Sequence, residues 1–301
     1  MDASLINSVR PLDVVLIIIL ILLVFLVLEI IREHLTFVIT RYHLASSKLV
    51  GLKGDMKVIF LCDLHNRRYG SANKKLIESI RNEKPDLILV GGDMVVAKFK
   101  KCYKNALEFM VQLPKICPVY LCNGNHEQRM KEVPGIYGDF ESYKSQLIRF
   151  GIRLLENESE FVDVCGTTVR ISGFEISMSN YNKENFRKIT RETMDSLVGK
   201  ADKHNFQILL THFPQLVSIG KKWGADLILA GHFHGGIVRI PGWRGVVTPK
   251  LKFFPKYSGE LTREGNQTII VSRGLGTHTI PIRLFNCAEV VVINFTSESY
   301  Q

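Results

Sequence analysis

The chain has 301 residues, of which 46% are hydrophobic and 23% are charged, and it includes 10 prolines and 23 glycines. This composition excludes a disordered chain and a collagen-like one, and the low mean hydropathy excludes a protein with many membrane spans. The net charge of +10 favours anionic partners, namely phosphorylated substrates, lipid surfaces or nucleic acid, without choosing among them. The six cysteines form no CxxC pair, so free thiols in a reducing compartment are expected rather than a disulfide framework.

The first strong pattern along the chain is an apolar run from Val14 to Ile31 that only Glu29 interrupts. As a helix, this run would be about 27 Å long, near the lower limit for crossing a bilayer. Charged residues follow it instead of a small-x-small cleavage site. We therefore predict an uncleaved single-pass anchor in residues 1–34, with the membrane span at about 14–31. Lysine and arginine are more frequent after the span than before it, which places the large C-terminal part in the cytoplasm.

From about residue 56 onward, short apolar runs typical of buried strands alternate with amphipathic stretches typical of helices. The alternation predicts βαβ units and a largely parallel inner sheet. The expected strands are 57–62, 86–90, 119–122, 161–164, 168–172, 207–211, 226–230, 268–272 and 289–295. The expected helices are 73–81, 105–111, 140–150 and 184–197. We interpret residues 35–55 as a linker and first strand region, and residues 56–301 as one domain.

Polar side chains with metal-binding chemistry directly follow five of the expected strands. Because the loops beyond the carboxyl ends of the strands meet in one crevice of an α/β sheet, we expect these side chains to lie together. Carboxylates and an amide combined with several imidazoles suit Mn, Fe or Zn better than Ca or Mg. A carboxylate shared between two ions about 3.5–4 Å apart would account for so many ligands. In chain order the candidates are Asp63, His65, Asp93, Asn125, His126, His212, His232 and His234.

Each candidate taken alone also has a structural interpretation. Asp93 follows two glycines and is able to cap the next helix, Asn125 is typical of a turn, and His212 precedes a Phe-Pro pair where a histidine with satisfied hydrogen bonds is common. The paired imidazoles of His232 and His234 between glycines have little packing rationale. It is the ordered set, with at least one member after each of five strands, that indicates a metal site.

The ordered motifs DLH (63–65), GD (92–93), GNHE (124–127), TH (211–212) and GHFH (231–234) resemble those of the calcineurin-like metallophosphoesterase superfamily, over about residues 56–295. The apolar start and the ending SRGLGTHTIPIRLFN resemble the YkuE-type branch of membrane-associated phosphohydrolases. The resemblance implies a four-layer α/β/β/α sandwich with a dinuclear metal site at the strand ends, preceded here by one transmembrane helix.

The same resemblance implies roles for individual residues. Two divalent ions, Mn, Fe or Zn with Mn favoured, would be bound, with Asp93 bridging them. His126 would lie beside the substrate as an acid or a phosphate-stabilising group. The remaining ligands would be Asp63, His65 and His234 at the first ion, and Asn125, His212 and His232 at the second.

The function we expect is that of a membrane-anchored metallophosphoesterase that cleaves a phosphoester or pyrophosphate bond with a metal-activated hydroxide. A lipid-linked substrate is one option, because the anchor holds the pocket near the bilayer and the 241–257 loop carries Trp243, Phe253, Phe254 and Tyr257. The alternatives are a nucleotide phosphodiesterase or nuclease, which the positive charge suggests, and a non-catalytic scaffold. No stable nucleic-acid complex is expected, and the substrate, the metal pair and the oligomeric state stay open.

Overall fold

The structure is a computed structural model that describes residues 10–98, 103–180, 186, 188–240, 245–248, 253–277 and 281–297. Among the residues considered above, Cys102 and Trp243 lie outside these ranges. The other five cysteines are all unpaired, as expected.

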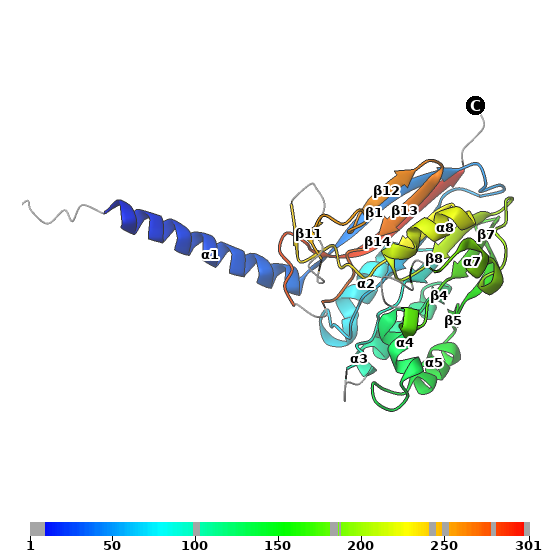
Figure 1. Ribbon diagram of the computed structural model, residues 1–301, viewed down its shortest axis with the longest axis horizontal. Helices are drawn as coiled ribbons and strands as arrows, with labels where there is room; N and C mark the ends of the chain where they lie inside the picture. Colours follow the sequence, from blue (N-terminus) through cyan, green and yellow to red (C-terminus); the bar gives the residue numbers. More distant parts are fainter. Residues whose placement is uncertain are drawn as a thin grey trace, which may run out of the picture.

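Two six-stranded sheets form the centre of the molecule (Figure 1). In the first sheet, β2 to β5 run parallel in sequence order, β14 is antiparallel to β2, and β1 is parallel to β14. In the second sheet, β7, β8, β9 and β13 run parallel, and the edge strands β6 and β12 are antiparallel to their neighbours. The first sheet comprises β1 (Phe37–Ser46), β14 (Ala288–Ser297), β2 (Met56–Leu61), β3 (Leu87–Val90), β4 (Val119–Leu121) and β5 (Ile152–Leu154). The second comprises β12 (Leu261–Glu264), β13 (Gln267–Val271), β9 (Leu227–Ala230), β8 (Phe206–Leu210), β7 (Thr167–Gly173) and β6 (Glu158–Val164).

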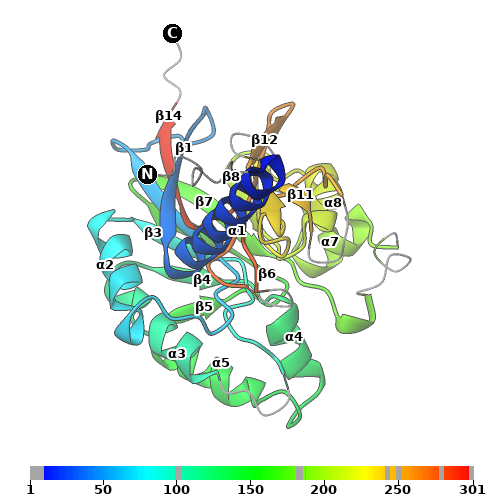
Figure 2. The ribbon, with the colours of Figure 1, turned by 90° about the vertical axis from the view of Figure 1, so that its left-hand side faces the viewer.

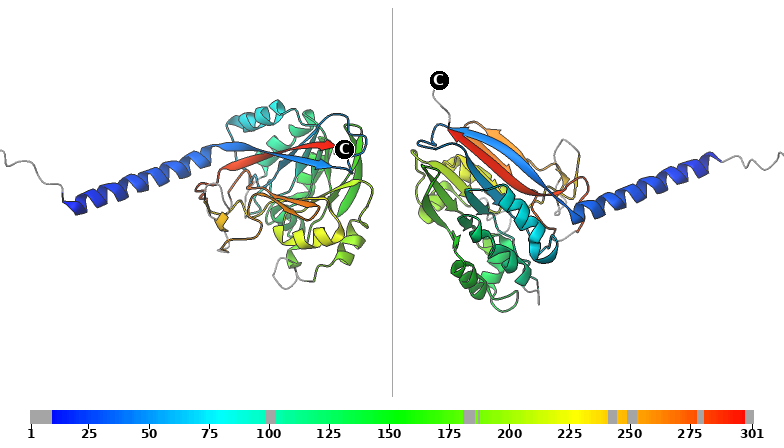
Figure 3. Two further views of the ribbon diagram at one scale, coloured as in Figure 1. Left: turned by 90° about the horizontal axis from the view of Figure 1, so that it is seen from above. Right: turned by 180° about the vertical axis from the view of Figure 1, so that it is seen from behind.

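The helices cover the outer faces of the two sheets, on opposite sides of the molecule (Figure 2). A short hairpin of β10 (Val238–Arg239) and β11 (Gly245–Val247) lies beside the base of the first helix (Figures 1 and 3). The helices are α1 (Pro11–Leu35), α2 (Lys74–Asn82), α3 (Lys104–Met110), α4 (Asn125–Glu132), α5 (Phe140–Arg149), α7 (Arg191–Leu197) and α8 (Val217–Trp223).

The central strands are buried on both faces, and their side chains alternate between two cores, because successive side chains of a strand point to opposite faces. In β2, Ile59 belongs to the core beneath α2, α3 and α5, whereas Phe60 belongs to the core between the sheets. On the second sheet, Leu209 of β8 packs in a third core with Trp223 of α8 and Met194 of α7. Three cores between four layers confirm the α/β/β/α sandwich.

Most of the expected elements are present, but the expected helix over 184–197 is wrong in its start. The helix α7 begins at Arg191, because the hydroxyl of Thr190 accepts the backbone N–H of Thr193 at 3.4 Å and caps its first turn. Residues 188–190 are not helical, and 184, 185 and 187 lie outside the described ranges. Within residues 35–55, β1 pairs with β14 along its whole length. The division of the chain at 34 and 55 stays a prediction.

The helix α1 projects from the domain (Figure 3), and its apolar side chains from Val14 to Leu28 are almost all exposed. Among the described residues it is the one helix that is long and apolar enough to cross a membrane. A helix with exposed apolar side chains on every face is unstable in water unless another apolar phase covers it.

The core between the sheets gives a stability prediction. We expect Phe60→Ala, which truncates a fully buried ring, to reduce the free energy of unfolding by about 3–5 kcal/mol. The matched control Phe150→Ala removes a ring that is 48% exposed and should change it by less than about 1 kcal/mol. Urea unfolding of the full chain in detergent, followed by the fluorescence of the buried Trp223, measures both. Equal losses in the two variants would contradict the core assignment.

Candidate metal centre

The candidate residues lie where strands of both sheets end, so the site straddles the central sandwich. Asp63 follows β2, and Asp93 follows β3. Asn125 and His126 form the first turn of α4, directly after β4. The second sheet contributes His212 after β8, and His232 and His234 after β9. All of them are buried except His232, which is partly exposed.

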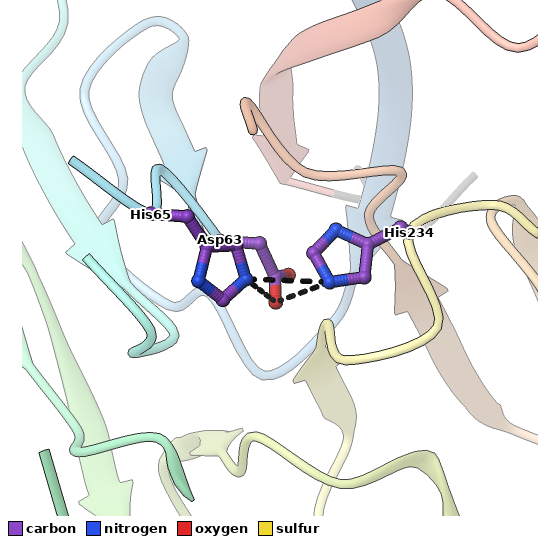
Figure 4. Close-up of side chains that lie close together, drawn as sticks. All are labelled: Asp63, His65 and His234. Carbon is purple, nitrogen blue, oxygen red and sulfur yellow. Dashed lines mark hydrogen bonds and ion pairs between the residues drawn. The ribbon is translucent and has the colours of Figure 1, made fainter. Parts of the chain in front are cut away.

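Three of these side chains converge on one point (Figure 4). The Nε2 atoms of His65 and His234 are 3.3 Å apart. They lie 3.7 and 3.6 Å, respectively, from Oδ1 of Asp63. The expected first group, Asp63, His65 and His234, is therefore close enough in space to share one cation.

A second group surrounds Asp93. Its Oδ2 is 3.1 Å from Nε2 of His212, whose Nε2 is in turn 3.3 Å from Nδ1 of His232. The same carboxylate oxygen is 3.9 Å from Nε2 of His65 in the first group. Asp93 therefore lies between the two groups, where a bridging carboxylate is needed.

Backbone carbonyl groups orient two of the imidazoles. Nδ1 of His212 donates to the carbonyl of Gly91 at 2.9 Å, and Nδ1 of His234 donates to that of Gly276 at 3.2 Å. With the proton on Nδ1, the Nε2 lone pair of each ring faces the Asp93 or Asp63 carboxylate. This second hydrogen bond is typical of metal-binding histidines, so both rings fit a divalent cation.

The electrostatics of the site also fit a cation. Burial opposes ionisation of Asp63 and Asp93, but the surrounding imidazoles outweigh it and hold both carboxyl pKa values below their usual range. Burial lowers the pKa of His234 to about 3, which keeps this ring neutral. Burial also disfavours the charged form of His212, but Asp93 outweighs this effect and raises its pKa to about 9. A divalent cation at Asp93 would compete with that proton.

The turns that carry these side chains have a strained backbone. Five of the candidate residues adopt left-handed φ angles between 51° and 69°: Asp63, His65, Asp93, His232 and His234. Such a conformation costs about 1–3 kcal/mol per residue and persists only where the surroundings enforce it. Its concentration at the candidate residues indicates that the fold directs these side chains inward.

Glu127 connects the Asp93 turn to the start of α4. Its carboxylate is fully buried and accepts the backbone N–H groups of Asp93 and Met94 at 2.8 Å and of Gly124 at 3.0 Å. A Cβ atom on Gly124 would lie 2.3 Å from Oδ1 of Asp93, so only glycine permits this approach. Glu127 stands in the GNHE motif, but sequence reasoning assigned it no role.

His126 is held beside both groups. Its Nδ1 accepts the backbone N–H of Ala97 at 2.9 Å, and its own backbone N–H donates to Oδ1 of Asp93 at 2.7 Å. The neutral ring therefore carries its proton on Nε2. His126 lies within reach of His65 and Asp93, and the preceding Asn125 is buried at the same helix start.

Sequence comparison places these motifs among known proteins. The family described as calcineurin-like phosphoesterase matches residues 56–236, which include every candidate residue. Bacillus subtilis YpbG is 26% identical over 247 residues, covering 79% of this chain and 80% of YpbG. The B. subtilis metallophosphoesterase YkuE is 26% identical over 266 residues, covering 86% and 85%. The Escherichia coli phosphodiesterase YaeI is 26% identical over 230 residues, covering 73% and 75%.

The Glu127 network gives a second prediction. We expect Glu127→Ala to reduce the free energy of unfolding by about 2–4 kcal/mol, because three buried N–H groups lose their acceptor. Divalent-metal affinity should fall as well, since the Asp93 turn is no longer fixed. Urea unfolding and isothermal titration with Mn²⁺ measure the two effects, with the exposed Glu141→Ala as control. Stability and affinity that match those of the control would contradict the organising role of Glu127.

Proposed function

The chain belongs to the calcineurin-like phosphoesterase family and is a metallophosphoesterase, and we propose that it hydrolyses phosphoester or pyrophosphate bonds at a two-metal centre on a membrane surface. The position of Asp93 between two groups of imidazoles carries this proposal. One ion would be held by Asp63, His65 and His234, and the other by Asn125, His212 and His232, with Asp93 shared by both.

The mixed nitrogen and oxygen donors suit Mn, Fe or Zn, and Mn is the first metal to test. When bound, a pair of such ions polarises a phosphoryl oxygen and lowers the pKa of a water molecule that attacks phosphorus. The buried ligands exclude bulk water from this region, which strengthens every charge interaction within it.

His126 supplies the proton in the proposed reaction. Because Ala97 donates to Nδ1, the imidazole presents Nε2–H, which is able to stabilise a phosphoryl oxygen or protonate the leaving oxygen. The hydrogen bond from the His126 backbone N–H to Asp93 keeps the imidazole beside the candidate metal ligands. The chain's own contribution is thus to hold the ligands and to place one proton donor beside the reacting phosphate.

The nearby arginines contribute less than their position after the DLH motif suggests. Arg68 pairs with Glu108 at 2.9 Å, with both side chains exposed to solvent. The guanidinium of Arg67 lies 5.3 Å from the ring centroid of Tyr69. Of these two arginines, Arg67 is the better candidate for binding the substrate's negative charge.

A lipid-linked substrate is supported by the surface beside the base of α1. Phe253 and Phe254 are 69% and 56% exposed, although both are large and apolar. They lie next to β11, since Phe254 N–H donates to the carbonyl of Val246 at 2.9 Å. Ile240 and Ile282 are also exposed on the two segments that join this surface to the metal centre. Apolar side chains at a membrane interface would bind the acyl part of an amphiphilic phosphoester.

We assign α1 the role of a single-pass anchor, with the catalytic domain on the cytoplasmic side. Basic residues follow its apolar part, among them Arg32 and Arg41. The unpaired cysteines agree with a reducing compartment.

The central test uses the full chain in detergent micelles, stripped of metal and reloaded with Mn²⁺. We expect metal-dependent hydrolysis of p-nitrophenyl phosphate or bis-p-nitrophenyl phosphate. The rate should be at least about 100-fold lower for Asp93→Asn, because replacing a residue that only hydrogen-bonds to a metal ligand already lowers activity by about 10–100-fold. The solvent-exposed His204→Asn is the matched control. Activity that survives both metal removal and Asp93→Asn would contradict the two-metal centre.

The membrane-facing surface gives a separate prediction. We expect the double variant Phe253→Asp with Phe254→Asp to hydrolyse phosphatidic acid or farnesyl diphosphate in mixed micelles about tenfold more slowly, while its rate on p-nitrophenyl substrates is unchanged. Charges at these positions oppose insertion into the interface. The control for a general effect of added charge is Phe150→Asp, which replaces an exposed ring at the end of α5. Equal rates on the lipid for all three proteins would exclude a role of this surface.

A further inference from the structure

The last turn of α1 carries a buried carboxylate. Glu33 is the single buried residue of this 25-residue helix, with 2% of its surface exposed. A carboxylate is costly to bury unless hydrogen bonds compensate for its lost hydration. Oε2 of Glu33 accepts the backbone N–H of Asn286 at 2.8 Å. The end of the helix is therefore joined to residues 281–287, the segment that directly precedes β14.

Asn286 continues this connection to the metal centre. It is fully buried, and its Nδ2 donates to the carbonyl oxygens of His234 and Gly236 at 2.7 and 2.5 Å. A Cβ atom on Gly235 would lie 2.3 Å from Oδ1 of Asn286, so the side chain fits closely against this loop. One residue thus links the Glu33 carboxylate to the backbone of a candidate metal ligand.

A buried arginine fixes the same imidazole from its other side. Nη2 of Arg283 donates to the carbonyl of Gly276 at 2.6 Å, and this carbonyl also accepts Nδ1–H of His234 at 3.2 Å. Nη1 of Arg283 donates to the carbonyl of Asn286 at 3.1 Å. The backbone and the ring of His234 are therefore both held by the 283–286 segment that α1 contacts.

The residues on either side of Asn286 also lie near α1 and the residue that follows it. The ring of Phe285 lies 6.5 Å from that of Phe25, and Sγ of Cys287 lies 3.6 Å from the hydroxyl of Thr36. Phe285 adopts a left-handed φ of 54°, which a bulky residue accepts only when its surroundings enforce it.

We propose that Glu33 and Asn286 are positioning residues for the metal centre, so that the membrane helix is part of the scaffold that sets the affinity for one cation. The proposal rests on the proposed function in one respect, because it takes His234 as a metal ligand. Residues that orient a ligand from behind typically change metal affinity when they are replaced. A change at the end of α1 should then alter metal binding at His234.

The test is a Co²⁺ titration of the full chain in detergent micelles, followed by visible absorption, which reports ligand geometry independently of hydrolysis. We expect Glu33→Ala to bind one of two Co²⁺ ions at least about tenfold more weakly and with an altered spectrum, while the other ion is unaffected. Glu29→Ala is the control, since Glu29 lies one turn earlier on α1 and pairs with Arg32 at 2.6 Å. Arg32 also lies 3.5 Å from Glu33, so this variant separates the loss of the Arg32 ion pair from the loss of the bond to Asn286. Glu33→Gln keeps an acceptor for Asn286 N–H and should restore the affinity.

Two results would overturn the proposal. One is Co²⁺ affinity and a spectrum for Glu33→Ala equal to those of the unmodified chain. The other is an equal loss in Glu29→Ala. Should Glu33→Ala fail to fold, Glu33→Asp decides, because it keeps the charge but shortens its reach to Asn286; weaker binding supports the proposal and unchanged binding refutes it. Failure of the proposed function is distinct, since the unmodified chain would then bind no Co²⁺.

Discussion

The buried carboxylate of Glu127 holds together the two turns on which the metal centre depends. By accepting backbone N–H groups from both the Asp93 turn and Gly124, it joins the ends of β3 and β4. Asp93 is thereby placed so that it also accepts the N–H of His126. Burying a carboxylate costs free energy, but hydrogen bonds from several N–H groups offset this cost and hold the carboxylate in one position. This rigidity positions a shared carboxylate between two groups of imidazoles.

The site also requires both sheets, because neither alone carries enough ligands. The first sheet delivers the two aspartates and His65, and the second delivers the other imidazoles of the two groups. The core between the sheets, which includes Phe60 and Leu210, therefore determines the distance across the centre. The left-handed turns at five candidate positions add local strain that this packing must offset.

The helix α1 has two chemically different parts. The side chains of its apolar part are almost all exposed and require an apolar environment, whereas its last turn is bonded to the domain through Glu33. The exposed Phe253 and Phe254 lie beside β11, and the hairpin of β10 and β11 lies beside the base of this helix (Figure 3). The proposed anchor and the proposed lipid-binding surface thus lie on the same side of the domain.

The sequence alone determined the apolar helix, the alternating strands and the ordered motifs, because these follow from local periodicity and from residue type. It also placed Asp63, Asp93 and the histidines at strand ends, and the topology of parallel strands then brings them together. Only the tertiary structure revealed the buried hydrogen bonds of Glu127, Asn286 and Glu33. Their partners are backbone N–H and carbonyl groups of other segments, as far as 253 residues away along the chain. Backbone groups are nearly the same at every position, so the pattern of side chains in the sequence does not predict such a hydrogen bond.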